Sequence, residues 1–296
     1  MSLSLYVTMP GEGGILPAIH PTSVRHPSSP SQIGIPAMCV IAFAYKMPGL
    51  GQLVLLANRD EYYARPATPL DWWDEYTDTL GGRDLQAGGS WLMVDGRGRF
   101  AALTNFREGY GQSGERSRGE LVQRFVTGED DPFAFADWLR DNHQHYAPFN
   151  LLYGKLDDLF HFHSRGARIA RVTPGIHTLS NATLDTPWFK SERLAEHLRG
   201  LRRPPGEDEA FGWLADATAA GPGQLPNTGV GLALEKTLSP VFIQGRDYGT
   251  RASMLLNVSA RGDVSLSELS WGLAGREAGR RRYTIRPGQI QHPAKP

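Results

Sequence analysis

Residues 38–61 read MCVIAFAYKMPGLGQLVLLANRDE, and this stretch decides the fold of the chain. Two apolar segments, residues 40–45 and 53–57, flank a turn that contains Pro48 and Gly49. Proline and glycine supply the backbone angles that turns need, so the pattern predicts two strands joined in a hairpin. The hairpin brings the polar run at residues 58–61, Asn-Arg-Asp-Glu, back beside the start of the first strand.

Cys39, the only cysteine in the chain, lies at that start. The pairing puts its thiol near Arg59, and a neighbouring guanidinium favours the thiolate, which is the nucleophilic form. A lone cysteine is also common as a small buried apolar residue, and its position alone favours that interpretation. The methionine at position 38 favours the interpretation of Cys39 as a nucleophile. If translation starts there and the methionine is removed, Cys39 becomes N-terminal, and its α-amino group, with a pKa near ~8, can take the thiol proton.

The composition bounds the class of protein. The chain has 296 residues, of which 40% are hydrophobic and 21% charged, so it can build a sizeable core. Thirty-one basic residues balance thirty-one acidic ones, which gives no electrostatic case for a nucleic-acid partner. A single cysteine excludes an internal disulfide and fits a cytoplasmic location. No apolar run approaches the ~20 residues of a transmembrane segment, so we expect none.

The first 37 residues differ from the rest. They hold six prolines but one arginine and one acidic residue, and they match neither a signal peptide nor a transit peptide. We expect residues 1–38 to be a disordered extension, arising either from a start codon assigned too far upstream or from a leader that is cleaved before Cys39. Residues 39–287 are expected to form a single domain, followed by a disordered tail at 288–296.

The remaining pattern alternates blocks of strands with blocks of helices. Strand patterns at 90–94 and 99–105 precede amphipathic helices at 117–126 and 131–142, and a loop is expected around Gly81 and Gly82. A strand meander, two more helices (from 187, and at about 208–219) and closing strands follow, the latter at 241–244, 251–258, 264–270 and 282–285. Hairpins imply antiparallel pairing, so the order predicts a layered α+β domain.

The Asn-Arg-Asp-Glu run after a Met-Cys strand resembles the signature of the NRDE family, also called the transport-and-Golgi-organisation family. The resemblance extends from Met38 to about residue 287. Further matching stretches are Gly-Ser-Trp-Leu at 89–92, Leu-Thr-Asn-Phe-Arg at 103–107, Leu-Ser-Asn-Ala at 179–182 and Tyr-Gly-Thr-Arg at 248–251. This family in turn resembles the N-terminal-nucleophile (Ntn) hydrolases, which implies a four-layer αββα sandwich with antiparallel sheets.

The likeness also implies a set of site residues. The implied nucleophile is Cys39, and the site acid is Asp60 or Glu61, of which Asp60 is preferred. The full implied catalytic set is Cys39, Arg59, Asp60, Asn105, Asn181 and Arg251. The implied substrate-binding residues are Glu61, Ser90 and Trp91. Side-chain amides such as those of Asn105 and Asn181 are good donors to a developing oxyanion, which supports the asparagines independently.

Two functions from different classes follow from the resemblance. The first is a cysteine Ntn hydrolase that cleaves a linear amide or related acyl bond of a small molecule, without a cofactor. The second is a non-catalytic protein that binds and moves haem or a lipid on the same fold. His161 and His163 share one face of a predicted strand, but no third ligand is evident, so no metal site is expected.

Overall fold

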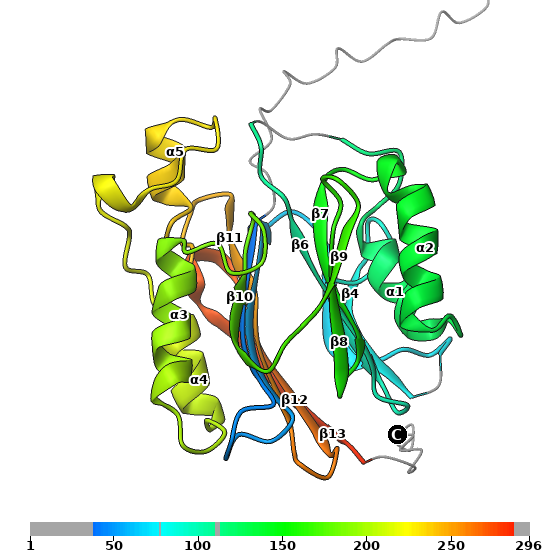
Figure 1. The fold of residues 1–296 in the computed structure, drawn as a ribbon. Coiled ribbons are helices and arrows are strands. Elements are labelled where there is room, and N and C mark those ends of the chain that lie inside the picture. Colours follow the sequence, from blue (N-terminus) through cyan, green and yellow to red (C-terminus); the bar gives the residue numbers. More distant parts are fainter. Residues whose placement is uncertain (1–37, 77, 110–112, 287–296) are drawn as a thin grey trace, which may run out of the picture. The chain divides into compact units, whose positions relative to one another are not determined.

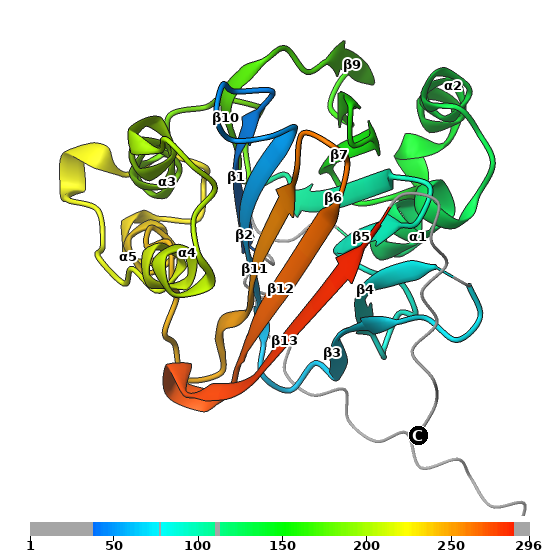
Figure 2. The same cartoon turned by 90° about the horizontal axis from the view of Figure 1, so that it is seen from below.

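A computed structural model describes residues 38–76, 78–109 and 113–286 of the chain. It contains two β-sheets in which every pair of neighbouring strands is antiparallel. Figures 1 and 2 show the sheets face to face, with helices on both outer sides. Residues 1–38 and 288–296 were expected to be disordered. Residues 1–37 and 288–296 lie outside the described part, whereas Met38 is the first residue of strand β1.

Sheet A holds the quoted hairpin near its middle. In spatial order its strands are β10 (Gly175–Leu179), β1 (Met38–Tyr45), β2 (Leu53–Tyr62), β11 (Tyr248–Val258), β12 (Val264–Trp271) and β13 (Glu277–Ile285). Sheet B follows the chain order β3 (Ala67–Trp72), β4 (Thr79–Asp84), β5 (Leu92–Asp95), β6 (Arg99–Asn105), β7 (Phe149–Lys155), β8 (Asp158–His163) and β9 (Arg168–Arg171).

Helices cover the outer face of each sheet. Helices α1 (Gly119–Thr127) and α2 (Pro132–Asn142) lie on sheet B, and α3 (Phe189–Gly200) and α4 (Glu207–Leu214) lie on sheet A (Figure 1). A short helix, α5 (Leu232–Thr237), follows before β11.

Among the described residues, three apolar cores lie between these layers, and a fourth, smaller cluster surrounds Met38 and Tyr248. Along β1, Phe43 and Tyr45 face the core between the sheets, while Ala42 and Ala44 face the core under α3 and α4. This alternation follows from the strand period of two, which sends successive side chains to opposite faces. A third core joins sheet B to α1 and α2. Three cores separate four layers, so the predicted αββα sandwich with antiparallel sheets is confirmed.

Some element predictions were wrong. The polar residues 58–61 do not follow the second strand but lie inside β2, because β2 pairs with β1 on one side and β11 on the other. The helix predicted at 208–219 ends at Leu214, residues 241–244 form no named strand, and α5 was not predicted.

The loop expected at Gly81 and Gly82 is also wrong, because both residues lie in β4. A Cβ atom at Gly82 would collide with the ring of Trp91, and one at Gly81 would lie 2.8 Å from the backbone oxygen of Leu92. These glycines therefore permit a close approach between neighbouring strands and do not mark a flexible segment. Within the described part, no helix is both long and apolar enough to span a membrane.

Candidate active site

The β1–β2 register places the thiol and the arginine directly opposite each other. Cys39 pairs with Arg59, and Met38 pairs with Asp60. Because the strand period is two, the side chains of Cys39 and Arg59 share the face toward sheet B, whereas Asp60 follows the alternate face toward the α3 layer. The predicted juxtaposition of the thiol with the Asn-Arg-Asp-Glu run is therefore present, in a strand and not at its end.

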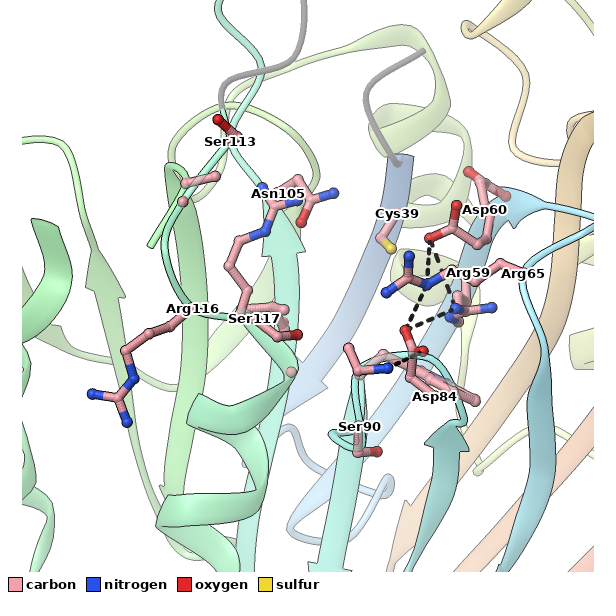
Figure 3. A pocket seen from close by; sticks show the side chains of 18 of the residues that line it. Cys39, Arg59, Asp60, Arg65, Asp84, Ser90, Asn105, Ser113, Arg116 and Ser117 are labelled. Carbon is pink, nitrogen blue, oxygen red and sulfur yellow. Dashed lines mark hydrogen bonds and ion pairs between the residues drawn. The ribbon is translucent and has the colours of Figure 1, made fainter. Parts of the chain in front are cut away.

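Cys39 lies in the wall of a pocket of about 350 Å³ between the two sheets. Figure 3 shows Asn105 on β6 across this pocket from Cys39 on β1. The lining includes seven of the nine residues named from the sequence: Cys39, Arg59, Asp60, Glu61, Ser90, Trp91 and Asn105. Asn181 and Arg251 are not among the lining residues.

Arg59 is held by two carboxylates and one ring. Its guanidinium lies 3.8 Å from both Glu61 and Asp84, and its central carbon lies 4.4 Å from the centre of the Trp91 ring. Asp84 also pairs with Arg65 at 2.6 Å. This network fixes Arg59 beside the thiol. Asp84 was missed by sequence reasoning because only the contact between the sheets brings it to the site.

The Cys39 thiol is partly buried, and its pKa is raised to about 11. Burial is the largest cause, and the negative charge of Asp60 is the next. Arg59 and Lys190 act in the opposite direction but do not overcome these effects. In the chain as it stands, where residue 38 precedes it, Cys39 is thus predominantly a thiol at neutral pH.

Asp60 occupies a buried polar cluster behind the thiol. The Thr250 hydroxyl donates a hydrogen bond of 2.6 Å to Oδ1, while Oδ2 has no hydrogen-bond partner in the described part of the chain. Burial raises the pKa of Asp60 to about 6, against the opposing charge of Lys190. Burial likewise lowers the pKa of Lys190 to about 8.

Lys190 is a second residue that sequence reasoning missed. It lies on the buried face of α3 together with Leu194 and Leu198, at steps of four residues. A lysine on the apolar stripe of an amphipathic helix was the available signal, since a buried lysine requires a specific partner or role.

The two asparagines have different surroundings. Asn105 is 7% exposed at the end of β6 and lines the pocket. Asn181 is fully buried, and its Nδ2 donates to the backbone oxygen of Asn105 at 2.9 Å. The backbone N–H of Arg107 in turn donates to the backbone oxygen of Asn181 at 2.8 Å. Asn181 therefore fixes the backbone that presents Asn105.

Arg251 and Ser90 make contacts within the fold. Nη1 of Arg251 donates to the backbone oxygens of Tyr62, Tyr63 and Arg65 at 2.9, 3.2 and 3.1 Å, which ties β11 to the end of β2. The Ser90 hydroxyl lies 2.7 Å from the backbone oxygen of Gly82, to which it donates. Both side chains thus hold backbone segments near the pocket.

Three comparisons place the chain among known proteins. The Transport and Golgi organization protein 2 homologs of Bos taurus and Homo sapiens are each 32% identical over 257 residues, covering 79% of this chain and 93% of theirs. A mutant conjugated bile acid hydrolase from Clostridium perfringens has a similar backbone, with 9% identity, a TM-score of 0.46, and coverage of 85% of this chain and 99% of that one. The family model described as Transport and Golgi organisation 2 matches residues 38–272. The chain therefore belongs to the Transport and Golgi organisation 2 family.

Proposed function

We propose that the protein is a hydrolase that cleaves an amide or related acyl bond of a small molecule, with Cys39 as its nucleophile. The observation that carries the proposal is the position of Cys39, which is the second residue of β1, faces Arg59 across the β1–β2 pair and borders the pocket. The neighbouring Asp60 keeps a buried carboxylate oxygen without a hydrogen-bond partner in the described residues. A buried acceptor of this kind requires a donor, and the α-ammonium group of a chain that begins at Cys39 would be one.

Removal of the residues before Cys39 is part of the proposal. With Met38 attached, the nitrogen of Cys39 is an amide, which has no basic lone pair and cannot accept the thiol proton. The backbone N–H of Met38 donates to the Tyr248 hydroxyl at 2.6 Å, and the Met38 side chain is fully buried. Loss of Met38 would open space beside Asp60 and Tyr248 for the new amino group, which would then serve as the general base.

The proposed reaction has two half-reactions. The amine takes the proton of the thiol, and the sulfur attacks the carbonyl carbon to give a tetrahedral oxyanion. The oxyanion re-forms the carbonyl as the C–N bond breaks, and the leaving nitrogen receives the proton from the α-ammonium group. Water then attacks the thioester with the amine again as base, which releases the acid and restores the thiol.

Asn105 is the candidate oxyanion donor because it borders the pocket across from Cys39 (Figure 3). An amide donor fixed in advance stabilises developing negative charge without reorganisation, and such a donor contributes on the order of 10²-fold or more in rate. Asn181 is a positioning residue in this scheme, through its hydrogen bond to the Asn105 backbone.

The chemistry of the pocket favours a polar small molecule over haem or a lipid chain. The ionisable lining residues besides Cys39 are Arg59, Asp60, Glu61, Arg65, Asp84, Glu115, Arg116 and Arg118. Placing an apolar chain against so many charged groups would remove water from them without replacing its hydrogen bonds, which costs free energy.

The test uses a protein with a specific protease site placed so that cleavage leaves Cys39 at the terminus. A library of acyl amides and thioesters is assayed before and after cleavage, alongside the Cys39→Ala variant. We expect hydrolysis only after cleavage and only with Cys39 present. Turnover by the Cys39→Ala variant would show that Cys39 is not the nucleophile.

A further inference from the structure

The arginines around the Cys39 pocket are not equivalent. Arg59 and Arg65 are each within 4.0 Å of Glu61 and Asp84. Arg116 pairs with Glu120, and Figure 3 shows its guanidinium directed away from Cys39. Three of the four arginines in the lining thus have a carboxylate partner on this protein.

Arg118 is the fourth, and it has no carboxylate within ion-pair distance among the described residues. Its one hydrogen bond there runs from Nη1 to the backbone oxygen of Pro148 at 3.1 Å. A guanidinium has five N–H donors, so most of the donors of Arg118 have no hydrogen-bond partner among the described residues. Burial lowers the pKa of Arg118 to about 10, and the negative charge of Glu61 opposes this shift. A partly buried cation in the wall of the Cys39 pocket therefore has no carboxylate at ion-pair distance among the described residues.

The backbone that carries Arg118 is firmly placed. Arg118 is the residue directly before α1, and the backbone oxygen of Gly119 accepts a hydrogen bond of 3.1 Å from the N–H of Ser90. A Cβ atom at Gly89 would collide with the backbone of Gly119, so the first turn of α1 is pressed against the segment between β4 and β5 that carries Gly89 and Ser90. The N–H of Arg116 donates to the oxygen of His145 at 3.0 Å, which holds the segment from the other side.

We propose that Arg118 binds a carboxylate carried by the substrate, so that the pocket selects small anionic acyl compounds over their neutral counterparts. A carboxylate can accept two parallel hydrogen bonds from one guanidinium, which adds geometric specificity to the charge attraction. The identification of this anion as a substrate rests on the proposed hydrolase function. The anion site itself rests on the unpartnered donors of Arg118 among the described residues and on its place in the same pocket as Cys39.

Two alkylating agents of nearly the same shape provide the test. Iodoacetate carries a carboxylate where iodoacetamide carries a neutral amide, and both react when a thiolate sulfur displaces iodide. Cys39 is the only cysteine, so the loss of free thiol in the full-length chain reports this site alone. The measured quantity is the ratio of the iodoacetate rate to the iodoacetamide rate, divided by the same ratio for glutathione.

We expect this ratio to be roughly ten or more in the unaltered protein and about one in Arg118→Met, as fits one charge-assisted contact. Arg118→Lys should give an intermediate ratio because lysine keeps the positive charge but lacks the planar guanidinium that can donate two parallel hydrogen bonds. Arg116→Met is the matched control and should leave the ratio unchanged. Circular dichroism and the thermal midpoint confirm that each variant is folded.

An equal ratio in the unaltered protein and in Arg118→Met would overturn the proposal. So would a fall of both rates by the same factor, because that result would assign Arg118 to stabilising the thiolate. The hydrolase function is tested separately with N-acyl amino acids and their primary amides. If neither is hydrolysed while the alkylation ratio depends on Arg118, the anion site stands and the hydrolase function fails.

Discussion

Asp60 in β2 and Lys190 in α3 are buried groups of opposite charge that act on each other without forming a direct ion pair or hydrogen bond. Asp60 is 1% exposed and Lys190 is 2% exposed, and Oδ2 of the one and Nζ of the other have no hydrogen-bond partner in the described residues. Each charge shifts the pKa of the other toward the ionised form, but burial outweighs this attraction in both cases. Burying these two charged groups therefore costs free energy, and changes in pH or substitution of Asp60 should alter the stability of the protein in a defined direction.

The first prediction concerns stability. The pKa of Asp60 is about 6 in the folded state and about 4 in the unfolded state, so the folded state keeps its proton longer. The contribution of Asp60 to the free energy of unfolding should therefore decrease as pH rises from 4 to 6. Asp60→Asn removes this titration and keeps an acceptor for Thr250, so its stability relative to the unaltered protein should rise by on the order of 2–3 kcal/mol across that range.

Urea unfolding of both proteins at pH 4, 5, 6 and 7 measures this difference. Lys190, with a pKa of about 8, does not change its charge in this range. A stability difference that is constant with pH would show that Asp60 does not titrate in the way described.

The second prediction concerns the thiol in the full-length chain. The carboxylate of Asp60 raises the pKa of Cys39, so Asp60→Asn should lower it. Alkylation by iodoacetamide at pH 8 should then be roughly tenfold faster, because removing a nearby like charge shifts a pKa by about one unit. Glu115→Gln, which also alters a lining carboxylate, is the control and should leave the rate unchanged. Under the proposed mechanism the same Asp60→Asn change lowers turnover by the chain that begins at Cys39, so the two measurements move in opposite directions.

The third prediction concerns Arg107 and Glu235, whose side chains are 2% and 3% exposed and form an ion pair of 2.8 Å. Glu235 also accepts hydrogen bonds from the N–H and the hydroxyl of Thr228. Glu235→Ala leaves the Arg107 charge buried without its partner, so it should destabilise the protein by about 3–5 kcal/mol. Adding Arg107→Met should restore much of this loss. A double-mutant cycle, measured by denaturant unfolding, gives the coupling free energy between the two residues. Additive effects of the two substitutions would show that the residues are not coupled.

The fourth prediction separates structural from reactive arginines. Arg251→Met removes the hydrogen bonds to the three carbonyl oxygens at the end of β2 and should cost about 1–3 kcal/mol of stability. The iodoacetamide rate at Cys39 should stay within twofold, because Arg251 does not line the pocket. A large loss of thiol reactivity in a folded Arg251→Met protein would give this residue the catalytic role that the family resemblance implied.

Local signals in the sequence predicted the framework of the fold. The turn at Pro48 and Gly49 and the apolar pattern around it gave the β1–β2 hairpin, and with it the pairing of Cys39 and Arg59. The helix start at Asp131 and Pro132 was also readable, because an aspartate side chain accepts from the first free N–H groups and proline suits the first helical position.

The rest of the site depends on contacts between distant segments. Asp84 reaches Arg59 only because sheet B packs on sheet A, and Arg118 reaches the pocket only because α1 begins against the Gly89–Ser90 backbone. Gly81 and Gly82 of β4 were predicted to lie in a loop because glycine is common both in turns and where strands approach closely. Only the contact of Gly82 with the Trp91 ring, seen in the structure, shows that the second reason applies. No local pattern carries that information.

Under the proposed mechanism, Cys39 attacks an acyl carbon only when it is the first residue of the chain. The most direct measurement is the intact mass of the protein, quenched in acid during reaction with an acyl-amide or thioester that it turns over, before and after cleavage in front of Cys39. We expect an acyl adduct on Cys39 after cleavage, and none on the uncleaved chain or on Cys39→Ala. An uncleaved chain that forms the adduct and turns over at the same rate would contradict this mechanism.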